Sequence, residues 1–157
     1  MILIALAAAV EAVRDRLEGR GIPWAVSGSV ALALQGVAVS CCDLDVVTTA
    51  AAAEHVTRLL AGTPLEPVAF TRRGDIRGLI GRTELDGVDV DVLGDVQNLL
   101  PDGRWTAAPR LDACVVQVTV GGRSCPVVEL SHLREAYAAM GKWEAVRLIE
   151  VALADGD

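Results

Sequence analysis

The stretch that most constrains the fold runs from Trp24 to Thr49, where two short apolar runs flank an Ala/Leu-rich segment. The runs at 24–26 and 44–47 have the composition of buried strands. Between them, the small residues Gly28 and Ser29 stand where the chain must turn into a helix over 30–35. The stretch therefore predicts a strand, a sharp turn, a helix and a second strand.

The second of these strands begins with the acidic pair Asp43-Leu44-Asp45. Side chains alternate across a strand, so both carboxylates project from the same face. Two adjacent carboxylates repel each other unless a cation lies between them, and Mg²⁺ prefers hard oxygen ligands of this kind. The pair therefore predicts a site for a divalent metal.

Length, composition and charge limit the class of protein. The 157 residues are sufficient for one domain with a buried core, and we expect a single domain over 1–157. The chain is 52% hydrophobic but only 3% aromatic, so Ala, Val and Leu must fill the interior, as in compact α/β domains. A net charge of −7 opposes non-specific adhesion to nucleic acid or to an anionic membrane.

The N-terminal segment and the cysteines indicate where in the cell the protein works. The apolar N-terminal run passes into charged residues from Glu11 onward, and it is too short to span a bilayer, which takes about 20 residues. We interpret 2–18 as an amphipathic helix. The four cysteines lack metal-ligand spacing and indicate reduced thiols in a cytoplasmic protein without a membrane partner.

A second acidic pair follows in a predicted hairpin over 76–93, whose turn is the favoured dipeptide Asp86-Gly87. In the outgoing arm, Val88 to Val92, valines line one face while Asp89 and Asp91 line the other. A two-residue turn would place Arg82 opposite Asp91 and Glu84 opposite Asp89.

The remaining segments complete the expected fold. A helix over 50–60 can be capped by Thr48 or Thr49, and a short strand is expected at 65–70. Residues 94–110 read as a loop. A second hairpin over 114–128 turns at Gly121-Gly122, and helices over 131–140 and 142–153 close the chain. The sequence thus predicts an α/β (α+β) domain with a small, twisted, mixed sheet backed by helices.

The order of these motifs resembles a known family. Gly28-Ser29, thirteen further residues, Asp43-Leu44-Asp45 and later Val90-Asp91-Val92 resemble the nucleotidyltransferase superfamily that shares the DNA polymerase β catalytic fold. The chain is most similar to minimal members, such as nucleotidyltransferases of antitoxin and AbiEii-type toxin systems and of aminoglycoside or lincosamide resistance. The similarity covers a core region at 22–93 and, more weakly, the hairpin and helices at 112–153.

The resemblance implies a site and a reaction. Asp43, Asp45 and Asp91 would bind two Mg²⁺ ions in the family's manner, and Gly28 and Ser29 would contact the triphosphate of an NTP. Lys142 is implied as a residue that approaches the nucleotide. The implied reaction transfers a nucleoside monophosphate from the NTP to a hydroxyl and releases pyrophosphate. Asp89 points the same way as Asp91, and the Val-Asp-Val-Leu setting favours Asp91.

Several alternatives follow from the same residues. The acceptor is a protein side chain of a toxin–antitoxin pair, a tRNA end, or a small molecule such as an antibiotic. Many relatives carry a basic residue before the acidic pair, but Val39, Cys41 and Cys42 fill those positions here. The difference motivates a second hypothesis, a catalytically silent module that binds a partner chain, for instance as an antitoxin. A third hypothesis is a plain structural domain without metal. Separately, the position of Arg82 opposite Asp91 leaves an alternative in which Arg82 merely neutralises Asp91.

The arginines of the hairpin region form the basic cluster of the chain. We interpret them as a solvated loop, and alternatively as a patch that guides a triphosphate or an RNA end. The cluster consists of Arg72, Arg73, Arg77 and Arg82.

Overall fold

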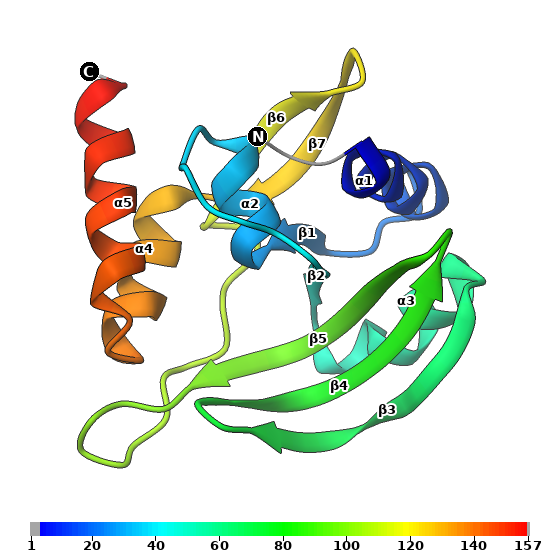
Figure 1. Ribbon diagram of the computed structural model, residues 1–157. Coiled ribbons are helices and arrows are strands. Elements are labelled where there is room, and N and C mark those ends of the chain that lie inside the picture. The colour runs from blue at the N-terminus through cyan, green and yellow to red at the C-terminus, as the bar shows by residue number, and fades with distance from the viewer. Residues whose placement is uncertain (1–3, 157) are drawn as a thin grey trace.

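A single mixed sheet of seven strands organises the protein in a computed structural model that describes residues 4–156 (Figure 1). The strand order is β3-β4-β5-β2-β1-β7-β6. The strands are β1 (Trp24–Ser27), β2 (Leu44–Thr48), β3 (Thr63–Arg73), β4 (Ile76–Leu85), β5 (Val88–Asn98), β6 (Val115–Val120) and β7 (Arg123–Val128). The helices are α1 (Ile4–Leu17), α2 (Gly28–Leu34), the 3₁₀ turn η1 (Ala50–Ala52), α3 (Ala53–Leu60), α4 (Leu130–Ala139) and α5 (Trp143–Asp155). The predicted fold class is confirmed.

The centre of the sheet is built from the strands that the sequence marks as most apolar. β2 runs antiparallel to β1 and parallel to β5, and β1 runs parallel to β7. In β5 the side chains of Val88, Val90 and Val92 are buried, as the alternation predicts. Small aliphatic side chains fill the core, so β1, β2 and β5 provide a rigid base for the polar residues on them.

The helices form two groups around the sheet. α1 and α3 pack against each other and against the sheet, whereas α2 contacts α4, and α4 packs on α5 (Figure 1). The helix predicted at 2–18 is confirmed as α1, although Ile2 lies outside the described residues. The cap predicted for the helix at 50–60 is formed by Thr49 at the start of η1, where its hydroxyl accepts a hydrogen bond from the amide of Ala52 at 3.2 Å.

Two strand boundaries differ from the prediction. The short strand expected at 65–70 is the eleven-residue β3, and residues 94–98, expected in a loop, continue β5. Tertiary pairing explains both differences, because β4 lies between β3 and β5 and pairs with each of them. On one side Arg77 of β4 pairs with Arg72 of β3, and on the other side it pairs with Gln97 of β5. Turn-forming residues such as Gly94 did not end the strand.

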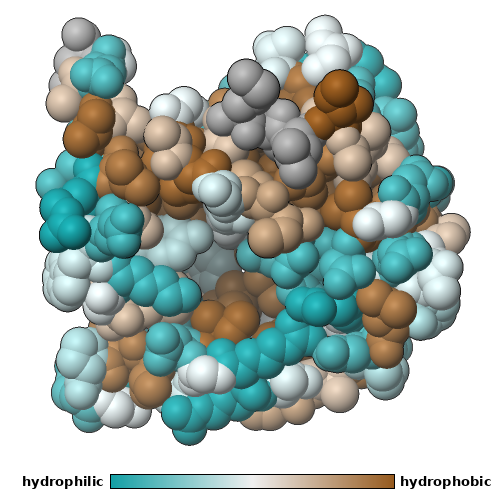
Figure 2. Space-filling model, viewed as in Figure 1, coloured by the Kyte–Doolittle hydropathy of each residue, from teal (hydrophilic) through white to brown (hydrophobic). Residues whose placement is uncertain are grey.

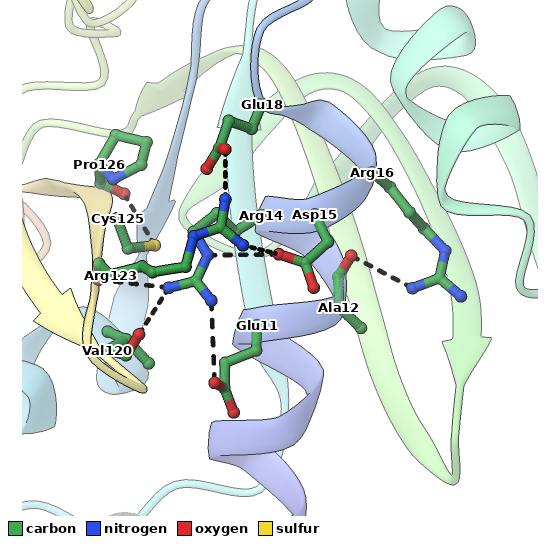
Figure 3. Close-up of polar contacts among 10 residues, drawn as sticks. All are labelled: Glu11, Ala12, Arg14, Asp15, Arg16, Glu18, Val120, Arg123, Cys125 and Pro126. Carbon is green, nitrogen blue, oxygen red and sulfur yellow. Dashed lines mark hydrogen bonds and ion pairs between the residues drawn. The ribbon is translucent and has the colours of Figure 1, made fainter.

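A buried arginine fastens α1 to the β6–β7 hairpin (Figure 3). The Nη1 atom of Arg14 donates hydrogen bonds to the carbonyl oxygens of Val120 at 2.5 Å and Arg123 at 3.3 Å. Glu11 and Asp15 lie 3.7 and 3.5 Å from the same guanidinium. The helix therefore holds the hairpin turn through polar contacts in addition to apolar packing.

None of the helices within residues 4–156 is long and apolar enough to cross a bilayer. The four cysteines are free thiols. Seen from the side of Figure 1, the molecule is hollowed near the centre, with apolar and polar side chains both facing the hollow (Figure 2).

Candidate active site

The predicted site residues meet on three neighbouring strands. Ser27, the last residue of β1, pairs with Asp45 on β2, and Asp45 pairs with Asp91 on β5. The three residues therefore stand in one row across the sheet. Asp43 lies just before β2, and its side chain is half exposed. The same register places Asp91, rather than Asp89, beside Asp45.

Gly28 packs directly against the carboxylate of Asp45. Its φ of +64° lies in the left-handed region, and a Cβ at this position would stand 2.3 Å from Oδ2 of Asp45. A side chain is therefore excluded both by the backbone conformation and by the carboxylate. The turn predicted at Gly28-Ser29 exists, and α2 begins at Gly28.

The carboxylate of Asp45 carries a charge that the surrounding protein compensates only in part. Burial, followed by the negative charges of Asp91 and Asp43, raises its pKa from 3.8 to about 6, and the positive charges of Arg82 and Arg73 only partly offset this rise. Within residues 4–156, Asp45 takes part in no hydrogen bond through its side chain and in no ion pair. A half-buried carboxylate without a partner is unfavourable, and a bound cation would relieve the cost.

Asp91, in contrast, is fully paired. Its carboxylate accepts two hydrogen bonds from Arg82, from Nε at 2.8 Å and from Nη2 at 3.0 Å, which confirms the predicted register of the hairpin. Arg73 on β3 adds a third contact, Nη1 to Oδ1, at 3.2 Å. The hydrogen bond to Asp91 raises the pKa of Arg82 above its ordinary value, so the guanidinium stays charged.

Arg82 reaches the other acids as well. It lies 3.6 Å from Asp89 and 3.9 Å from Asp43. The interpretation of the arginine cluster as a solvated loop is wrong, since these arginines lie on β3 and β4 and the side chains of Arg73 and Arg82 bind carboxylates. The alternative in which Arg82 neutralises Asp91 is realised in this arrangement.

The fit of the acids to Mg²⁺ can be judged from these contacts. Among residues 4–156, no three His, Cys, Asp or Glu side chains are gathered closely enough to form a ready metal site. The donor type nevertheless suits the ion, because Asp43 and Asp45 at the start of β2 and Asp91 on the adjacent β5 all offer carboxylate oxygens. Of the three, Asp45 is the carboxylate that has no ion pair among residues 4–156.

A cavity of about 300 Å³ opens beside Asp45. Ser27, Gly28 and Asp45 line it at the sheet, and Tyr137 and Lys142 line it from the C-terminal helices. Lys142, for which the resemblance predicts a role near the nucleotide, thus lies in the cavity wall, and its Nζ lies 5.8 Å from the ring centre of Tyr137. Ser29 is not among the lining residues.

Three lining residues were not predicted as site residues. Tyr137 falls at an ordinary helix position in the sequence, and only the packing of α4 brings it to the cavity, where burial and then the charge of Asp45 raise the pKa of its phenol to about 12. His132 was interpreted as a cap or packing residue, yet it lies in the cavity wall with Glu135. A second hollow of about 350 Å³ shares Pro109, His132 and Glu135 with the first.

A family model described as aminoglycoside-2''-adenylyltransferase matches residues 9–151 of the chain. No protein with a curated description matches the sequence. Among solved structures, a Thermotoga maritima protein provisionally described as a nucleotidyltransferase is 28% identical, with a TM-score of 0.82. That similarity covers 99% of this chain and 96% of the other.

Two further structures share the fold at lower identity. The antibiotic-resistance factor ANT(2'')-Ia, in complex with adenylyl-2''-tobramycin, is 12% identical with a TM-score of 0.62, over 94% of this chain and 89% of the other. The lincomycin-bound lincosamide antibiotic adenylyltransferase LnuA is 11% identical with a TM-score of 0.58, over 91% of this chain and 95% of the other. Similarity at this level establishes the fold alone.

Proposed function

The chain belongs to the aminoglycoside-2''-adenylyltransferase family and is a nucleotidyltransferase, and we propose that it uses Mg²⁺ and an NTP to modify a hydroxyl of a small, cationic acceptor. In this reaction the acceptor oxygen forms a bond to the α-phosphorus of the NTP. The bond from that phosphorus to the bridging oxygen breaks, and pyrophosphate leaves. The hydroxyl proton passes to a nearby base or to water.

The observation that carries the proposal is the position of Asp45. Its unpaired carboxylate lies against Gly28, stands in register with Asp91, and faces a cavity of about 300 Å³. A divalent ion bound there would neutralise phosphate charge and polarise the phosphorus that is attacked. We assign its coordination to Asp43, Asp45 and Asp91.

The other site residues are assigned to the nucleotide. Gly28 lines the cavity beside Asp45, so phosphate oxygens bound there would lie near the main chain at the start of α2; Ser29, the second residue implied by the resemblance, follows Gly28 outside the cavity lining. Lys142 stands exposed at the cavity wall and would attract the triphosphate through its positive charge. Asp91 would serve as the base or complete the metal site.

The acceptor is assigned from charge and from the related proteins. Glu129 and Glu135 line the second hollow, and Arg110, which also lines it, is paired with Asp112 at 3.2 Å. An acidic lining favours an acceptor that carries amino groups, such as an aminoglycoside. This choice agrees with the family to which the chain belongs, in which the reaction named is adenylylation of an aminoglycoside.

Other assignments rank below this one. Family membership favours an enzyme over a catalytically silent binding module. A toxin–antitoxin partner chain stays a prediction from the resemblance to AbiEii-type systems.

Nucleotide transfer can be tested directly by incubating the protein with each α-labelled NTP and Mg²⁺, in separate reactions with a panel of aminoglycosides and lincosamides and with a cell extract. We expect label to move to an aminoglycoside, with an added nucleoside monophosphate in the product mass, and we expect Asp45→Asn to reduce the rate at least ~100-fold. Transfer to an RNA or a protein of a cell extract instead would overturn the assigned acceptor. No transfer from any NTP to any of these acceptors would overturn the proposed reaction.

A further inference from the structure

The cluster of acids formed by Asp43, Asp45, Asp89 and Asp91 already contains a cation, the guanidinium of Arg82. It binds both carboxylate oxygens of Asp91 at 2.8 and 3.0 Å and lies 3.6 Å from Asp89 and 3.9 Å from Asp43. A planar guanidinium that binds a carboxylate through two parallel hydrogen bonds is among the strongest polar contacts in proteins. Arg82 therefore occupies oxygen atoms that a metal ion would also need.

The pairing is selective within the cluster. Arg82 and Arg73 both bind Asp91, whose side chain is about 10% exposed, and neither of them lies within ion-pair distance of Asp45. One acid is thus neutralised by the protein while its neighbour in the next strand is left unpaired. The fold supplies part of the positive charge that the cluster needs and leaves the remainder to a ligand.

We propose that Arg82 is a positioning residue that competes with Mg²⁺ for Asp91 and Asp43, an inference that rests on the proposed function. In the metal-free protein it keeps together the repelling carboxylates of Asp43, just before β2, and Asp91, on β5. A carboxylate oxygen engaged with the guanidinium is less available to a metal, so binding of the ion requires that Arg82 loosen its contacts with Asp91. Arg82 therefore stabilises the metal-free fold and lowers the apparent affinity for the ion.

The test compares Arg82→Gln with Arg77→Gln, a matched change on the same strand. Arg77 donates a hydrogen bond to Gln97 and lies 4.4 Å from the ring centre of Trp105, and it has no ion pair among the described residues. Titration calorimetry with Mg²⁺, and separately with Mn²⁺, measures the affinity of each protein for metal alone. Melting curves in EDTA measure the stability of each metal-free fold.

We expect the stability of the metal-free fold and the affinity for Mg²⁺ to change in opposite directions. Arg82→Gln should melt at a lower temperature than wild type in EDTA yet bind Mg²⁺ about tenfold more tightly, because hydrogen bonds to a charged group no longer oppose the ion. Arg82→Lys keeps the charge but cannot form two parallel hydrogen bonds, so its affinity for Mg²⁺ should lie between those of wild type and Arg82→Gln. Arg77→Gln should match the wild-type affinity.

The contrary results separate the two proposals. If folded Arg82→Gln or Arg82→Lys binds Mg²⁺ as weakly as wild type, or more weakly, Arg82 does not compete with metal, and the proposed reaction still stands. If neither wild type nor any variant binds Mg²⁺ or Mn²⁺, even with an NTP present, the metal site itself is wrong and the competition is refuted with it.

Discussion

At the residue scale, the ionisation of Asp45 governs how the metal-free protein responds to pH. Its pKa rises from 3.8 to about 6 on folding, chiefly through burial. Between these values the folded chain binds more protons than the unfolded chain, so the free energy of unfolding falls as pH rises through this window. Below about pH 4 the carboxyl is protonated in both states, and the penalty disappears. At neutral pH the penalty is about 3 kcal/mol.

Asp45→Asn removes this penalty. We expect the variant to be more stable than wild type at pH 8 without metal, by roughly 2 kcal/mol, and equal to it near pH 4. Urea denaturation at the two pH values, with EDTA present, measures the difference. Equal stability at pH 8 would show that Asp45 is not held as an uncompensated carboxylate.

The acidic residues of the candidate site were predictable from the sequence, but not all of the side chains that pair with them were. Asp43, Asp45 and Asp91 are polar residues in apolar strands at a spacing that the resemblance makes specific, and the two-residue turn fixed Arg82 opposite Asp91. Arg73 could not be assigned to Asp91, because its position depends on how β3 pairs with β4 and on a long, flexible side chain reaching across β4.

At the element scale, hairpins were the most predictable features. Asp86-Gly87 and Gly121-Gly122 each join two strands at the expected position, since both dipeptides suit the left-handed conformations of tight turns. The extent of β3 was not predictable. Pro64 and Pro67 interrupt its strand pattern, and its residues are mostly exposed, so the register with β4 decides where it begins and ends.

The contact between α1 and the β6–β7 hairpin offers a test at this scale. Arg14→Leu would leave the carbonyl oxygens of Val120 and Arg123 without their donor (Figure 3). We expect a loss of about 2–4 kcal/mol in the free energy of unfolding. Arg16→Leu is the matched control, because Arg16 donates only to Ala12 of its own helix and should cost far less. An equal loss in the two variants would contradict a specific role for Arg14.

At the scale of the whole molecule, the order of strands brings the site together. β2 and β5 are adjacent and parallel, although some forty residues of helix and hairpin separate them, and this pairing places Asp45 beside Asp91. Composition and local pattern predict the strands but do not specify such long-range neighbours. The C-terminal helices then close the cavity with Tyr137 and Lys142. Only Lys142 was implied in advance, through the resemblance.

The central claim is that a metal-bound triphosphate lies over Gly28 with Asp45 as a ligand. Titration calorimetry with Mg²⁺ and a non-hydrolysable ATP analogue tests it on wild type, Asp45→Asn and the exposed control Asp95→Asn. We predict saturable binding by wild type, binding by Asp95→Asn within about twofold of it, and at least tenfold weaker binding by Asp45→Asn, or ~1.4 kcal/mol. Equal binding by all three proteins, or none by wild type, would contradict the claim.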